Sequence, residues 1–233
     1  MSAAVPDSPT PRSLPTAREM LTTTRSVRKR LDWDRAVDTA SVERALDTAL
    51  QAPNGSNNQL WQWILVTDPA LRAALADCYR EAAGPYLTAM REAADGDARR
   101  RRLWEASAHL ADNLHRAPVL VVPCLAVGPE DFEARFTDLG FPDPVGHAAH
   151  SVYYGSIWPA IWSLMLALRL ENLVSAVTTL HLGREADAAR VLGLPDTVRQ
   201  AGLLAVAHPT GHGFRPAPRR PAAEVTHHDT WRS

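Results

Sequence analysis

The sequence predicts a domain of the α/β or α+β class, and three observations support this prediction. Short runs of branched and apolar residues alternate along the chain with longer segments in which apolar residues recur at helical spacing. The chain has 233 residues, of which 45% are hydrophobic, and this is enough for a substantial core. No G-x-G-x-x-G motif or Walker loop follows a predicted strand. An anionic cofactor would therefore have to be held by side chains.

The first two predicted helices carry start or stop signals. Thr16 and Glu19 form a capping box, which predicts a helix that begins there and runs toward Thr24. In the segment 39–53, apolar residues repeat at helical spacing, and Pro53 predicts the end of this second helix.

The middle of the chain predicts two strands with two helices between them. Residues 61–67 are aromatic and branched, as in a short strand, whereas residues 118–127 are nearly all apolar, which predicts a strand buried on both faces. Asp68 is the expected N-cap of a helix over residues 70–83. A polar helix is expected over residues 99–117, and its run of arginines is interpreted as a solvated helix start because acidic residues lie close by.

The last third of the chain predicts a lid-like segment and a buried helix. Residues 128–150 are rich in Gly, Pro and His, and they predict a loop or lid that contains a short helix. Residues 153–170 are apolar nearly all round, so we expect a buried helix that either kinks at Pro159 or begins near it. The remaining predicted elements are strands at 174–179 and 201–209, with a helix at 185–192 between them.

These elements predict one domain with an extension at each end. Residues 1–16 are rich in Pro and Ser and predict a disordered tail, and the domain is expected to span residues 17–215. Residues 216–233 are also rich in Pro. Because such a segment cannot build a core alone, we expect it to run extended across another surface.

Charge and hydropathy argue against two classes of partner. The 25 basic and 26 acidic side chains create no overall field that would attract nucleic acid. No apolar run approaches the roughly 20 residues that a membrane span needs, and the start of the chain lacks the apolar region of a secretory signal. Cys78 and Cys124 form no metal-spaced motif, and we expect both to be free thiols. We therefore expect a soluble cytoplasmic protein that binds neither nucleic acid nor membranes.

Three separated segments carry side chains suited to an anionic, planar ligand. They are "RSVRK" at 25–29, "APNGSNNQLW" at 52–61 and "RR" at 219–220. Guanidinium groups match phosphate, whereas amides and hydroxyls match the edge of a heterocycle. Each segment alone is also explained by an ordinary structural role, the first as a basic helix end and the second as a polar turn.

Taken together, these segments resemble the FMN-dependent nitroreductase family. The similarity covers "TTRSVRKRLDW", "ALQAPNGSNNQLWQWILVTDPALR", "TTLHLGREADAARVLGLP" and "RRPAAEVTHHDTW", in that order, from about residue 17 to 231. The resemblance implies an α+β fold, a three-layer sandwich with a central, mostly antiparallel sheet flanked by helices. It also implies a homodimer with FMN at the interface, in which the segment 216–233 crosses to the partner subunit.

The resemblance implies an FMN site built from several segments. Arg25 and Ser26 match the positions that hold the phosphate and the ribityl chain, and Arg28 matches a basic residue at the flavin N1 and O2 edge. The other matching residues form a loop from the partner subunit, a segment beside the isoalloxazine ring and a C-terminal phosphate clamp. These are Pro53, Asn54, Ser56 and Asn57; Thr178 and Thr179; and Arg219 and Arg220. Lys29 and Arg30 receive no role in the site and are expected to be solvated at the surface.

The implied activity is an FMN oxidoreductase that needs no catalytic protein nucleophile. NADH or NADPH would deliver hydride to flavin N5 and leave, and a nitroaromatic, a quinone or a similar acceptor would then be reduced, with Arg28 tuning the flavin potential. Another reaction on the same flavin (dehalogenation, enoyl reduction or flavin fragmentation) stays open, as does flavin binding without turnover.

Several conspicuous side chains have alternative explanations. Trp158 and Trp162 are expected in core or dimer packing, with a contact to the substrate pocket by Tyr153, Tyr154 or Trp158 as the alternative. His181 is not expected to reach the flavin. The histidines near residues 147–150 and 227–228 predict no metal site. Phe132 and Phe136 are expected to form a lid over the flavin that determines substrate selectivity.

Overall fold

A six-stranded antiparallel sheet forms the centre of the protein. The computed structural model describes residues 14–140, 146–211 and 213–231. Strand β6 pairs with β3 on one side and with β4 on the other, and β3 also pairs with β2. The two-residue strand β1 pairs with the end of β6, and the two-residue strand β5 pairs with the end of β3. The strands are β1 (Leu31–Asp32), β2 (Trp61–Val66), β3 (Val119–Leu125), β4 (Val174–Thr178), β5 (Arg199–Gln200) and β6 (Leu203–Pro209).

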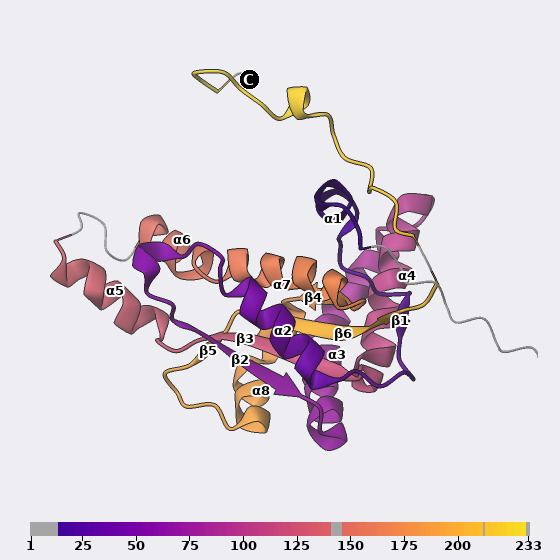
Figure 1. Ribbon diagram of the computed structural model, residues 1–233, viewed down its shortest axis with the longest axis horizontal. Helices are drawn as coiled ribbons and strands as arrows, with labels where there is room; N and C mark the ends of the chain where they lie inside the picture. The colour runs from indigo at the N-terminus through magenta and orange to yellow at the C-terminus, as the bar shows by residue number, and fades with distance from the viewer. Residues whose placement is uncertain (1–13, 141–145, 212, 232–233) are drawn as a thin grey trace, which may run out of the picture.

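Helices cover both faces of this sheet and make three layers (Figure 1). Alternate residues of β3 point to opposite faces: Val119 and Val121 join one apolar cluster, and Leu120 and Val122 join the other. Helices α2, α5, α6 and α7 contribute to the first cluster, and α3, α4 and α8 contribute to the second. The helices are α1 (Ala17–Thr23), α2 (Thr39–Ala49), α3 (Pro69–Glu92), α4 (Ala98–Asn113), α5 (Pro129–Asp138), α6 (His147–Gly155), α7 (Trp158–Leu170) and α8 (Glu185–Leu192).

The structure confirms the α+β sandwich and most of the predicted elements. The Thr16–Glu19 capping box starts α1, Asp68 caps α3, and all residues of β3 are buried, as expected. The predicted buried helix is in fact two helices, because α6 ends at Gly155 and α7 begins beside Pro159 in its first turn. No described helix is long and apolar enough to cross a membrane.

Two differences from the predicted elements have physical causes. Helix α3 continues to Glu92 with Pro85 inside it, because Ala83 just before the proline is buried and Leu87 just after it packs against the second cluster. This burial offsets the backbone hydrogen bond that proline cannot donate. The strands β1 and β5 were not predicted, since two-residue strands are too short to show a period.

The segments predicted to lie outside the core are partly described. Residues 1–13 of the predicted N-terminal tail and residues 141–145 of the predicted lid lie outside the described part of the chain. The short helix expected between residues 128 and 150 is α5. After Phe214 the chain leaves the sandwich in an extended course, and its residues 218–226 are all exposed (Figure 1).

Candidate functional site

The basic segment 25–30 lies along the free edge of β4. The Val27 amide donates to the carbonyl of Ser175 at 2.8 Å. The Ser26 hydroxyl donates to the carbonyl of Val177 and accepts from its amide, each at 3.2 Å. Ser26, predicted for the cofactor, thus uses its hydroxyl to fix the segment to the sheet. This attachment positions the arginines on either side of Ser26 and Val27.

In the described part of the chain, no side chain neutralises the charge of Arg25 or Arg28. Nη2 of Arg25 is buried and makes no hydrogen bond in the described part of the chain. Arg28 is half-buried and likewise has no hydrogen bond or ion pair among the described residues. A buried polar group without a partner is costly, so an anion that binds here would relieve that cost.

Both arginines line a cavity of about 410 Å³, which we call the arginine cavity. It is bounded by residues 25–30, by Ala106 of α4 and by residues 213–215. Its wall therefore carries several cationic side chains and no carboxylate. Such a surface suits a phosphate or another dianion.

Lys29 and Arg30 hold structure together. Lys29 is half exposed and pairs with Glu105 of α4 at 2.8 Å. Arg30 donates to the carbonyls of Thr210 and Gly213, each at 2.9 Å, and lies 4.4 Å from the ring centroid of Phe214. The expectation that Arg30 is merely solvated is wrong, because it fixes the start of the C-terminal extension.

Thr178 lies beside this cluster, with Thr179 next to it. Thr178 ends β4 and is half-buried, and Thr179 is exposed. Burial raises the pKa of Tyr79 on α3, although a hydrogen bond with Thr178 and the charge of Arg28 oppose that rise. Tyr79 is therefore close both to Arg28 and to the end of β4. Sequence reasoning missed Tyr79, whose only signal is a hydroxyl on the buried face of a helix.

The amide loop that follows α2 holds three non-glycine residues in the left-handed region. Ser56, Asn57 and Gln59 have φ angles of 51°, 52° and 49°. The Asn54 side chain stabilises this course by accepting from the Gln59 amide at 3.0 Å. Predicted site residues Pro53, Ser56 and Asn57 are exposed here. Strained and exposed loops of this kind are common at ligand sites.

Gly55 attaches the amide loop to α6. Its amide donates to the Ser156 hydroxyl at 3.1 Å. A Cβ atom at this position would lie 2.8 Å from Val152 Cγ1 and 2.9 Å from the Ser156 hydroxyl oxygen. Only glycine allows this close approach.

One copy of the chain does not bring the amide loop to the arginines. The loop packs on α6, before the start of α7, whereas Arg169 near the end of α7 donates to the hydroxyls of Thr23 and Thr24 beside Arg25. Thirteen residues of α7 separate these places, which is about 20 Å of helix. The amide loop therefore lies before the start of α7, and the basic segment lies further along this helix (Figure 1).

The predicted C-terminal arginines differ in position. Arg219 lines a second cavity, of about 400 Å³, together with Arg25 and Trp162. Arg220 is exposed and does not line that cavity. Arg25 thus lines both the arginine cavity and this second cavity, whereas Arg219 lines only the second one.

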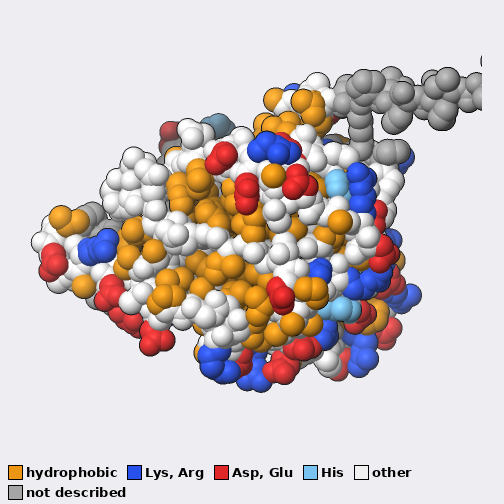
Figure 2. Space-filling view, turned by 60° about the horizontal axis from the view of Figure 1, so that its bottom comes forward, with side chains coloured by type: hydrophobic (Ala, Val, Ile, Leu, Met, Phe, Trp, Pro, Cys, Tyr) orange, Lys and Arg blue, Asp and Glu red, His pale blue; other side chains and the backbone are white. Residues whose placement is uncertain are grey.

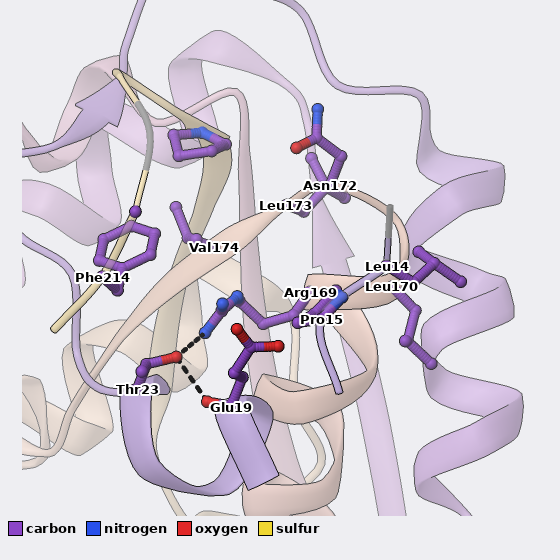
Figure 3. A pocket seen from close by; sticks show the side chains of 12 residues that line it. Leu14, Pro15, Glu19, Thr23, Arg169, Leu170, Asn172, Leu173, Val174 and Phe214 are labelled. Carbon is purple, nitrogen blue, oxygen red and sulfur yellow. Dashed lines mark hydrogen bonds between the residues drawn. The ribbon is translucent and has the colours of Figure 1, made fainter. Parts of the chain in front are cut away.

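A further cavity, of about 440 Å³, lies between α1, the end of α7 and Phe214 (Figure 3). Its charged groups are Glu19 and Arg169, and Arg169 already donates to Thr23. Because these two charges are opposite, this cavity is less suited to a dianion than the arginine cavity.

Buried histidine and phenylalanine side chains lie away from the arginine cavity. His181 is 1% exposed, and burial lowers its pKa to about 4, so its ring is neutral at pH 7. Phe132 is also buried and packs on Tyr153 at 5.2 Å between ring centroids, so it anchors α5, and the lid over the flavin stays a prediction. The side chain of Phe136 lies outside the described atoms. In the described residues, no group of His, Cys, Asp and Glu could hold a metal ion.

A comparison with protein families decides the family of this chain. The sequence model of the nitroreductase family matches residues 21–208, which include the basic segment, the amide loop and the end of β4. The chain belongs to the nitroreductase family.

Solved structures with the same fold include several flavin proteins. A BluB-like flavoprotein from Clostridium difficile 630 has a TM-score of 0.68 at 18% identity, covering 92% of this chain and 99% of the other. An NADPH:FMN oxidoreductase from Vibrio harveyi, complexed with NAD+, has a TM-score of 0.64 at 17% identity, covering 93% and 78%. An iodotyrosine deiodinase bound to FMN and 3-iodo-L-tyrosine has a TM-score of 0.63 at 18% identity, covering 92% and 98%.

The side chains of this nitroreductase fit FMN. The ligand has one dianionic phosphate and a planar ring with carbonyl oxygens at its edge. Among the described residues, Nη2 of Arg25 is a buried donor without a partner, and Arg28 beside the end of β4 has no hydrogen bond or ion pair. A phosphate and a ring edge would satisfy these two groups.

Replacing Ser26 with Ala should destabilise the nitroreductase fold. The substitution removes the two bonds to Val177, whose amide and carbonyl then lack these partners. We expect the free energy of unfolding to fall by about 1–3 kcal/mol in urea titrations followed by circular dichroism. Ser151→Ala, at an exposed position of α6, is the control. Equal stability of the two variants would contradict the anchoring role of Ser26.

Proposed function

We propose that this protein is an FMN oxidoreductase that takes hydride from NADH or NADPH and reduces nitroaromatics, quinones or similar electron-poor acceptors. The observation that carries this proposal is the buried Nη2 of Arg25, which has no hydrogen-bond partner among the described residues and lies in a cationic cluster beside the end of β4. It supports a dianionic ligand with a planar group, and family membership makes FMN the best candidate.

Each predicted residue then has a distinct task. Arg25 and Arg219, which line one cavity, would hold the phosphate. Arg28 would place a positive charge at the N1 and O2 edge of the ring, and Thr178 and Thr179 would lie beside the ring. When bound, FMN supplies the redox chemistry by accepting hydride at N5 and passing electrons to the acceptor. The protein binds, orients and adjusts the charge around it, and no protein nucleophile is required.

We propose that the amide loop reaches the flavin of a second copy of the chain. In a single copy this loop packs on α6, before the start of α7, whereas the arginines lie further along α7. Trp158 and Trp162 are 36% and 39% exposed, and they lie one turn apart on α7, so together they form exposed apolar surface. Figure 2 shows a face on which apolar side chains gather, with most charged ones around its edge. A homodimer would cover such exposed apolar surface, and the C-terminal extension would cross to the partner.

A reducing compartment suits this protein. Cys78 and Cys124 are both free and buried. Burial raises the pKa of both thiols, that of Cys124 to about 12, so neither forms a reactive thiolate at neutral pH. We propose the cytoplasm as the place of action.

Anaerobic spectroscopy tests this function. Purified protein should be yellow, should lose its flavin absorbance when NADH or NADPH is added, and should recover it with a nitroaromatic or a quinone. Colourless protein that stays colourless after incubation with FMN would contradict the cofactor. Reduced protein that rejects both classes of acceptor would contradict the proposed acceptors and favour another reaction on the same flavin.

A further inference from the structure

The rim of the arginine cavity carries more positive charge than the single phosphate of FMN requires. Arg25 and Arg219 already account for that phosphate in the proposed function. Lys29 and Arg215 also line the arginine cavity. Helix α4 adds further cations from the side of Ala106.

Helical spacing places Arg101 and Arg102 at this rim. Residues four apart lie on the same face of a helix. Arg102 therefore lies one turn before Ala106, which lines the cavity, and Arg101 lies one turn before Glu105, which pairs with Lys29 at 2.8 Å. The Lys29 hydrogen bond lowers the pKa of Glu105, and the charges of Arg101 and Arg102 add to this effect. Both guanidinium groups are thus close to the Lys29–Glu105 pair.

No described side chain neutralises these cations. Arg101, Arg102 and Arg215 are exposed, and none has a hydrogen bond or an ion pair within the part of the chain that the structure describes. The nearby carboxylate of Glu105 is already engaged by Lys29. By contrast, Arg100 on another face of α4 pairs with Asp97 at 3.4 Å and donates to the carbonyl of Ala93 at 3.2 Å.

We propose that Arg101 and Arg102, with Arg215, bind the 2′-phosphate on the adenosine ribose of NADPH and make NADPH the preferred electron donor. This inference rests on the proposed oxidoreductase function and deepens it. NADPH differs from NADH only by this dianionic phosphate, which guanidinium groups bind with well-matched hydrogen bonds. A donor that must leave before the acceptor enters needs an open binding site. The exposed rim of the arginine cavity provides such a site.

Isothermal titration calorimetry of the FMN-loaded protein tests the binding site directly. The ligands are adenosine 2′,5′-bisphosphate, adenosine 5′-monophosphate and inorganic phosphate. We expect the bisphosphate to bind about tenfold more tightly than the monophosphate. Arg102→Gln should reduce this ratio of the two affinities, and the double variant with Arg101→Gln and Arg102→Gln should bring the two affinities close to each other. Arg100→Gln, which removes one charge from the same helix, should leave the ratio unchanged.

Steady-state kinetics give a second readout. The ratio of kcat/KM for NADPH to that for NADH should exceed unity. This ratio should be lower in Arg102→Gln and lowest in the double variant with Arg101→Gln and Arg102→Gln. Equal binding of the two adenosine nucleotides would overturn the inference, and so would inorganic phosphate that binds as tightly as the bisphosphate. Yellow protein that oxidises NADH and NADPH equally would contradict this inference alone. Protein that holds no FMN would contradict the proposed function as well.

Discussion

Replacing Arg25 with Ala should weaken FMN binding about thirtyfold or more. Nη2 of Arg25 is buried without a partner among the described residues, so its contact with a phosphate would be a charge-assisted hydrogen bond in a partly desolvated place.

Arg28→Ala should lower the reduction potential of bound FMN, because the extra negative charge of the reduced flavin would lose a nearby cation. Flavin fluorescence titration gives the dissociation constant, and anaerobic titration against reference dyes gives the potential.

Arg91→Ala is the matched control for both arginine variants. Arg91 is an exposed arginine in the last turn of α3, and no residue of the arginine cavity belongs to that helix. Its removal should change neither the flavin content nor the potential. If Arg25→Ala and Arg28→Ala behave like this control, the arginine cavity is not the flavin site.

Replacing Gly55 with Val should remove FMN binding although every arginine is intact. A Cβ atom at Gly55 would lie 2.8 Å from Val152 Cγ1, so the amide loop must move away from α6. Overpacking of this kind costs about 1–3 kcal/mol of folding free energy. The displaced loop would no longer present Asn54, Ser56 and Asn57 to the flavin of the second copy. Flavin content per chain and the urea midpoint measure the two effects.

Gly155→Ala separates the loop from general damage to α6. A Cβ atom at Gly155 would meet no other atom within 4 Å, so this substitution should retain both FMN and stability. Gly55→Ala should lie between the two variants. Full flavin content in Gly55→Val would show that the amide loop takes no part in binding.

Local signals in the sequence predicted much of the fold. Helix α8 was expected at residues 185–192, which are the bounds it has, and a capping box located the start of α1. The apolar run of β3 predicted burial on both faces, because such a run can be satisfied only between two layers. The strands β1 and β5 escaped prediction because their two residues pair only through long-range contacts.

The candidate site was predicted by residue type, whereas the partners of each residue were not. Arg25, Arg28 and Arg30 look alike in the sequence. In the structure, however, Arg30 donates to two carbonyls and packs on Phe214, whereas Arg25 and Arg28 lack such partners in the described chain. Tyr79 was missed because only the fold places its helix beside the end of β4. Such pairings depend on segments far apart in the chain, which no local pattern encodes.

Mixed dimers test most directly whether two copies of the chain build each flavin site. Two chains with different tags are co-expressed. One chain carries Arg25→Ala and Arg28→Ala, and the other carries Gly55→Val. The mixed dimer is then purified through both tags. The variant homodimers should hold almost no FMN. The mixed dimer should hold about one FMN, because one of its two sites joins intact arginines to an intact amide loop. Mixed dimers as empty as the variant homodimers would contradict the shared site.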